Sequence, residues 1–101
     1  MKIVFHDLAK DDLDNAAAFY EQQEKGLGRE VYSFLAKQIE QLPDRAGTHL
    51  FLGHCYRTVL QCRFPYYLVF YQIEGQQLRI LAVLDGRRDP RRNQQLLDKR
   101  F

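Results

Sequence analysis

Arginines gathered near the end of the chain are the residues best suited to chemistry. Around the pair Asp89-Pro90, the stretch GRRDPRRNQ (86–94) carries four of them: Arg87, Arg88, Arg91 and Arg92. An arginine guanidinium fits phosphate oxygens well, because it is planar, rich in donors and charged at any working pH. The stretch is therefore a grip for nucleic acid, a catalytic arginine cluster, or the solvated start of a last helix with Asp89 as its cap and Pro90 at its first position.

Charge is divided unevenly along the 101 residues. Residues 85–101 hold six Lys/Arg and three Asp, a balance of +3, whereas residues 1–84 hold nine Lys/Arg and ten Asp/Glu, a balance of −1. We therefore expect an acidic partner or a phosphate at the C-terminal end. Since the whole chain carries only +2 and has no recognition-helix signal, direct binding to DNA is not expected.

Cleavage of RNA without a metal is one chemistry that these residue types could support. It needs a base for the 2′-hydroxyl proton, a donor for the leaving oxygen, and positive charge on the phosphate. Arginine supplies the charge, and a tyrosine donates the proton or stacks on a base. The candidate residues for such a site are Arg57, Arg63, Tyr67, Arg87 and Arg88, with Tyr71 as a second tyrosine. No general base is evident, because none of the three histidines has a visible partner in the sequence.

Other classes of site have little support. The chain has no glycine-rich phosphate loop, and its only serine, Ser33, lies inside a predicted helix with no base beside it. The aspartates between residues 7 and 14 are better explained by the dipole at a helix start than by a metal. We expect neither a metal nor a cofactor.

The elements that would position these residues follow from hydrophobic periodicity. Spacings of three and four residues predict a helix that starts at an Asp7 cap and ends near Gly26, and a second helix that runs from Arg29 until Pro43 stops it. The GLG turn between them is short, so the two helices should form an antiparallel hairpin. Strands are predicted at 2–6, 55–64, 66–73 and 78–84, and a loop at 43–54.

The predicted fold class is α+β, as a single domain over residues 1–101 in the order β-α-α-β-β-β. The helical hairpin should pack on one face of a four-stranded, mostly antiparallel sheet, followed by a short C-terminal helix or tail. The opposite face is expected to be too apolar to be left to water. Either the C-terminal segment covers it, through Leu96, Leu97 and Phe101, or a partner chain does.

The N-terminus MKIVFHDLAKDD has too short an apolar stretch for a signal peptide. No window of the sequence approaches the length of a membrane span. We therefore expect a cytoplasmic protein that does not act in a membrane.

Two stretches of the chain together resemble a known family. They are DLDNAAAFYEQQEKGLGREVYSFLAKQIEQLP (12–43) and FPYYLVFYQIEGQQLRILAVLDGRRDPRR (64–92). The sequence resembles the RelE/ParE superfamily of small bacterial toxins from type II toxin-antitoxin (plasmid stabilisation) systems. The resemblance runs from Leu8 to Arg92. Its most specific parts are FPY at the start of the central strand, AV at the end of the next strand, and RRDP directly after it.

The resemblance implies growth arrest, held in check by a cognate antitoxin whose disordered segment folds on the toxin. In such systems operator DNA is bound only through the antitoxin. The resemblance places contacts to the cellular target at Arg87 and Arg88, where the superfamily keeps functional arginine after the last strand. The residues expected to bind the antitoxin lie on the sheet face opposite the helices: Tyr67, Val69, Tyr71, Arg79 and Leu81.

Two biochemistries occur in the superfamily, since RelE-like members cleave mRNA in the ribosome and ParE-like members inhibit DNA gyrase. Tyr67 stands where RelE-like members often carry arginine, and Phe101 ends the chain where some of them carry histidine and an aromatic residue. The RRDP string is more typical of ParE-like members, although Asp85 stands where their pattern often has histidine. The resemblance thus favours a gyrase inhibitor without enzymatic activity. The alternatives are a ribosome-dependent mRNA endoribonuclease and a degenerate, non-toxic member that only binds its antitoxin.

Overall fold

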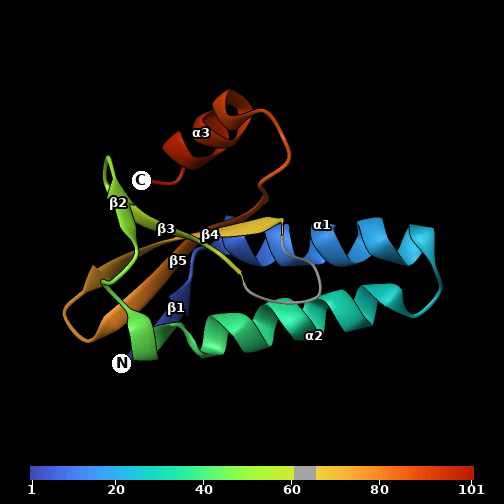
Figure 1. Ribbon diagram of the computed structural model, residues 1–101, viewed down its shortest axis with the longest axis horizontal. Helices are drawn as coiled ribbons and strands as arrows, with labels where there is room; N and C mark the ends of the chain where they lie inside the picture. Colours follow the sequence, from blue (N-terminus) through green and yellow to red (C-terminus); the bar gives the residue numbers. More distant parts are fainter. Residues whose placement is uncertain (61–65) are drawn as a thin grey trace.

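A computed structural model of the chain describes residues 1–60 and 66–101 (Figure 1). The elements in chain order are β1 (Lys2–Phe5), α1 (Asp7–Gln23), α2 (Leu27–Glu40), the 3-10 helix η1 (Leu42–Arg45), β2 (Leu50–Leu52), β3 (Cys55–Val59), β4 (Tyr67–Glu74), β5 (Gln77–Asp85) and α3 (Pro90–Asp98). The predicted α+β class is confirmed, and the predicted elements occur in the predicted order with one additional strand, β2. None of the helices in the described ranges combines the length and apolar character needed to cross a membrane.

The sheet has five strands in the order β1-β5-β4-β3-β2. β1 runs parallel to β5, and the other neighbouring pairs are antiparallel. The predicted count of four strands is wrong, because β2 lies in the segment 43–54 that was expected to be a loop. A three-residue strand is too short for its periodicity to be recognised in the sequence.

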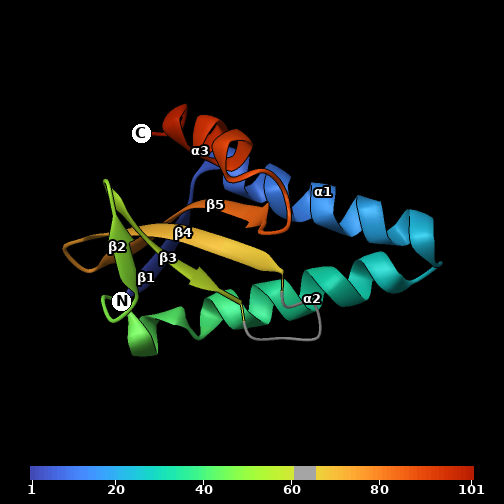
Figure 2. The ribbon, with the colours of Figure 1, turned by 45° about the horizontal axis from the view of Figure 1, so that its top comes forward.

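The helices α1 and α2 form the predicted hairpin, which covers one face of the sheet (Figure 2). Close packing between them depends on Gly28, because a Cβ there would lie 2.5 Å from the carbonyl oxygen of Ala17. The carboxylate of Glu21 accepts hydrogen bonds from the N–H groups of Gly26 and Gly28, both at 3.0 Å, and so caps α2. The first helix is capped by His6, whose Nδ1 accepts from the N–H of Leu8, and the expected Asp7 cap is wrong by one residue.

Beneath the hairpin lies the larger of two apolar clusters, which we call the hairpin cluster. It joins buried residues of both helices to the inner face of β4 and β5. Its members include Ala9, Leu13, Val31, Leu35, Ile39, Tyr67, Val69, Tyr71, Leu78, Ile80 and Val83.

The helix α3 covers the opposite face (Figures 1 and 2). Leu97, which is 3% exposed, and the half-buried Leu96 pack there over Phe70, Leu81, Ala82 and Leu84, a set that we call the α3 cluster. The expectation that the C-terminal segment closes this face is therefore confirmed for Leu96 and Leu97. Phe101 remains 55% exposed, and its ring makes a T-shaped contact with the ring of His54, with 5.6 Å between the centroids.

A bulge in β5 decides which side chains face which layer. Phe70 pairs with Ala82 and Tyr71 pairs with Ile80, so Leu81 is an extra residue between them. Before the bulge Ile80 faces the hairpin, and after it Ala82 faces α3. Strict alternation along the predicted strand 78–84 would place Leu78, Ile80, Ala82 and Leu84 on one face, and the bulge divides them between the two faces.

Candidate target-binding site at the end of β5

Arg87 is held in place by two neighbours just after β5. Its Nε and Nη2 donate to the two carboxylate oxygens of Asp85, at 3.2 Å and 3.1 Å, and its own N–H donates to Oδ1 at 2.9 Å. The guanidinium also lies over the ring of Tyr66, 5.0 Å from its centroid. The side chain is thus oriented before it meets any partner.

The electrostatics of this pair keep both groups charged. Burial by itself raises the pKa of the Asp85 carboxyl, but the hydrogen bonds from Arg87 outweigh it and hold the pKa below its ordinary value. The same contact raises the pKa of Arg87 above its ordinary value. Asp85 therefore acts as an anchor for the arginine that follows it.

Arg88 is placed differently. Its N–H donates to the carbonyl oxygen of Asp85 at 3.2 Å, while its exposed side chain makes no hydrogen bond or ion pair with any residue that the structure describes. The side chain lines a cleft of about 270 Å³ between α1, the end of β5 and α3. The cleft also has an apolar side, which includes Phe19, Leu84 and Leu96. An uncommitted cation beside an apolar surface can bind an acidic or phosphate-bearing partner.

The start of α3 is fastened to the same turn. Asp89 caps the helix by accepting from the N–H of Arg91 at 2.9 Å, and Pro90 is its first residue, which confirms the prediction for this pair. Nδ2 of the buried Asn93 donates to the carbonyl oxygen of Asp85 at 3.0 Å. Hydrogen bonds therefore fix both ends of the turn between β5 and α3. This restricts the positions that Arg87 and Arg88 can occupy.

A buried ion pair in the wall of the cleft was not predicted from the sequence. Arg100 and Asp12 are 5% and 8% exposed at their side chains, and Nη2 of Arg100 donates to Oδ1 of Asp12 at 3.0 Å. Nη1 of Arg100 also donates to Oδ2 of Asp12, which makes the pair bidentate. Both side chains bond the backbone of β5 as well: Val83 N–H donates to Asp12 Oδ2 at 2.9 Å, and Arg100 Nη1 donates to the Leu81 carbonyl at 3.1 Å. Asp12 had been explained by the helix dipole, and nothing in the local sequence links it to a residue 88 positions away.

The residues expected to bind an antitoxin do not share one exposed face. Tyr67, Val69 and Tyr71 belong to the hairpin cluster and are buried against the helices, so their expected place on the opposite face is wrong. Leu81 does face α3, but it is 1% exposed. Arg79 alone is accessible, with its guanidinium 3.6 Å from the carboxylate of Glu74.

The candidate ribonuclease residues are brought together only in part. Arg57 pairs with Phe70 and therefore points to the α3 side, whereas Tyr67 points to the hairpin side. Burial raises the pKa of Tyr67 from 10.0 to about 12, so its phenol gives up a proton less readily than an ordinary tyrosine does. Arg63 lies outside the described residues. Tyr67 lines the same cleft as Arg88, and the charges of Arg87 and Arg88 act to lower its pKa.

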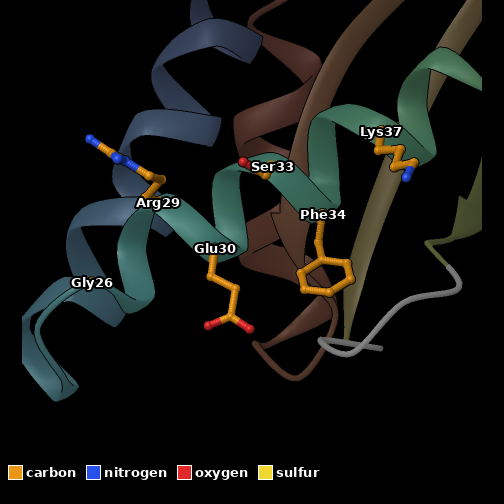
Figure 3. A pocket seen from close by; sticks show the side chains of 6 residues that line it. All are labelled: Gly26, Arg29, Glu30, Ser33, Phe34 and Lys37. Atoms are coloured by element: carbon orange, nitrogen blue, oxygen red, sulfur yellow. The ribbon is translucent and has the colours of Figure 1, made fainter.

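Another hollow, of about 440 Å³, lies on the surface of α2 (Figure 3). Figure 3 shows the side chains of Glu30 and Phe34 projecting from the helix on the same side, with Arg29 and Lys37 along the same helix. Its lining carries both signs of charge, so it has no preference for an anion. In residues 1–60 and 66–101, His, Cys, Asp and Glu form no group of three that could hold a metal ion.

The fold is the one expected for the RelE/ParE superfamily, and comparison with known proteins confirms the family. The chain matches the family model described as "ParE toxin of type II toxin-antitoxin system, parDE" over residues 3–90. It therefore belongs to the ParE toxin family, as the resemblance predicted. A solved structure described as "Chromosomal ParDE TA system from P. aeruginosa" is 16% identical, with a TM-score of 0.74 over 84% of this chain and 95% of that chain. At that identity the likeness establishes the fold. No curated protein matches the chain.

Proposed function

We propose that this chain acts as the toxin of a type II toxin-antitoxin pair and inhibits DNA gyrase through Arg87 and Arg88. The observation that carries the proposal is the pair itself, on a chain of the ParE family. Arg87 is oriented by Asp85 and Tyr66, while Arg88 has no side-chain partner among the described residues. Together they offer one rigid and one adaptable cation at the end of a strand.

We further propose that a cognate antitoxin neutralises the toxin by covering this basic end. An acidic segment that is disordered alone could order on the arginines and on the apolar wall of the cleft. Arg79 is the remaining accessible member of the expected antitoxin-binding set. Operator DNA would be bound by the antitoxin, and the pair would act in the cytoplasm, where gyrase and ribosomes work.

The experiment is expression of the chain without an antitoxin, followed by growth. We expect arrest from the wild type and reduced toxicity from Arg88→Ala, because that side chain contributes charge and little packing. Arg91→Ala is the matched control, since Arg91 is 89% exposed on the same segment and pairs with Asp89 instead of lining the cleft. Equal toxicity of wild type and Arg88→Ala at equal expression would remove this site from the proposal.

The target is identified with the purified chain. A gyrase inhibitor should trap cleaved DNA in a supercoiling assay, and Arg88→Ala should weaken that effect. Cleavage of mRNA only when ribosomes are present would instead favour the endoribonuclease. Unaffected growth on expression alone would indicate a degenerate member that only pairs with its antitoxin.

A further inference from the structure

The strand β2 is the edge of the sheet and carries an unusual surface. Leu50, Phe51 and Leu52 are 55%, 54% and 51% exposed, so a short run of large apolar side chains is left to water on both faces of the strand. In the described part of the chain, β3 is the only strand that pairs with it. Edge strands usually carry a charge or a proline that discourages pairing, and this one has neither.

Charge around the strand indicates what kind of partner fits. Residues 46–56 contain no Lys, Arg, Asp or Glu, although such residues make up 28% of the chain. His49, next to the strand, is hydrogen-bonded to Tyr71, with 2.5 Å between Nδ1 and the phenol oxygen. The pKa of His49 is lowered, mainly by burial and to a smaller extent by the positive charge of Arg45. The nearest cations are Arg45 and Arg57, which lies opposite Leu50 on β3. The three residues of β2 are themselves neutral, so an identical strand would meet no repulsion from them.

The backbone fixes the register of such a pairing. β2 and β3 are joined by the two-residue turn Gly53-His54, with Gly53 at φ +65°, so Leu52 and Cys55 are the hydrogen-bonded pair next to the turn. Bonding pairs alternate with non-bonding pairs in an antiparallel ladder. Phe51, opposite Tyr56, therefore directs its N–H and C=O away from β3 and toward the open edge.

We propose that β2 pairs with β2 of a second copy of this chain, antiparallel, about a two-fold axis at Phe51. The N–H and C=O of each Phe51 then bond those of the other, and Leu50 of one copy lies beside Leu52 of the other. The two phenyl rings meet on the hairpin side, where each already packs on Tyr56 with 4.9 Å between ring centroids. The contact is isologous and joins two sheets into one.

The size of the contact sets its strength. A three-residue strand with three half-exposed side chains buries much less than the roughly 1,200 Å² of a standard interface. The dimer should therefore form at high concentration and dissociate on dilution. This inference does not depend on the proposed target, because β2 lies at the far edge of the sheet from β5.

The test is the oligomeric state of the free, full chain by sedimentation over about a hundredfold range of concentration. We expect the wild type to dimerise as concentration rises and Phe51→Lys to stay monomeric. Tyr32→Lys is the matched control, since Tyr32 is 41% exposed on α2, and it should dimerise like the wild type. A wild type that is monomeric throughout, or a Phe51→Lys variant that still dimerises, would overturn the proposal.

Two further measurements test the backbone pairing itself. Phe51→Pro removes the outward N–H without removing a bond to β3, and it should abolish the dimer while circular dichroism stays native. Amide exchange followed residue by residue should show protection of Phe51 that grows with concentration, while protection of Leu50 and Leu52 stays constant. Exchange at Phe51 that is independent of concentration, or that only an antitoxin slows, would assign the edge to another partner and refute the dimer.

Discussion

The hairpin side and the α3 side of the sheet are closed in different ways. On the hairpin side, two helices of 17 and 14 residues bury a continuous apolar layer. On the α3 side, a nine-residue helix contributes Leu96 and Leu97, and its end is fastened by the ion pair between Arg100 and Asp12. The packing of a large apolar layer does not depend on any single contact, whereas the packing of a short helix depends on a few contacts.

The ion pair also solves a problem of the sheet. β1 pairs with β5 only as far as Ile80, so the outer edge of β5 beyond that point has lost its neighbour. Asp12 and Arg100 supply the missing partners for Val83 N–H and the Leu81 carbonyl. A buried backbone group without a partner costs free energy comparable to a lost hydrogen bond, so the pair extends the sheet by side chains.

The largest expected effect comes from removing one half of this pair. Asp12→Ala should lower the free energy of unfolding by about 4 kcal/mol, because it leaves the buried Arg100 charge and the Val83 N–H unpaired. Urea unfolding measures this, with the exposed neighbour Asp11→Ala as control. The double change Asp12→Leu with Arg100→Met should recover the part of the loss that comes from the unpaired charge, while the Val83 N–H and the Leu81 carbonyl still lack partners. No recovery at all would show that the charge is not a cause of the loss.

The hairpin side should respond to loss of area. Leu35→Ala, at a position that is 0% exposed, should lower the free energy of unfolding by about 3 kcal/mol through lost burial and a cavity. The loss should be global, so amide exchange should accelerate throughout the sheet. A melting temperature close to that of the wild type would argue against a continuous core under the hairpin.

Leu97→Ala is the matched change on the α3 side and should cost less, about 2 kcal/mol, since a short terminal helix can relax around the gap. Faster amide exchange should be concentrated in residues 90–100. If exchange accelerated equally in α1 and α2, the two sides would form one cooperative unit and the contrast between them would fail.

The smallest effect concerns Tyr67, at the border between the hairpin cluster and the cleft. Burial raises its pKa from 10.0 to about 12, so the unfolded chain releases this proton first as the pH rises. Stability that is present below about pH 10 is therefore lost as the pH rises toward 12. Tyr67→Phe should reduce this loss by about 1 kcal/mol in urea unfolding at alkaline pH. The exposed Tyr32→Phe should not, and an equal change in both would refute the assignment to Tyr67.

Much of the fold could be predicted because its signals are local. β4 and β5 were predicted to within one residue at each end, since their apolar runs flank a tight turn with Gly75 at φ +58°. Asp89 and Pro90 predicted the start of α3 from cap chemistry. β2 was not predicted, because three residues are too few to show a hydrophobic periodicity, although the apolar run LFL is evident in the sequence.

The candidate site was predicted in part. Arg87 and Arg88 were identified as candidate residues. The sequence did not show that the side chains of Asp85 and Tyr66 contact the guanidinium of Arg87 and not that of Arg88, because this depends on the conformation of the turn. The faces of β4 were assigned wrongly, because periodicity tells which residues share a face and not which layer covers that face.

The sequence by itself determined the helical hairpin, the strands of the central sheet, the cap of α3 and the ParE family. Each of these depends on residues that are close together in the sequence or on a contiguous sequence motif. Only the tertiary structure decided which layer buries Tyr67 and Tyr71 and that Asp12 contacts Arg100. It also decided where the bulge at Leu81 changes which face of the sheet the side chains of β5 occupy. Those outcomes depend on how segments far apart in sequence come together, and no local spacing carries that information.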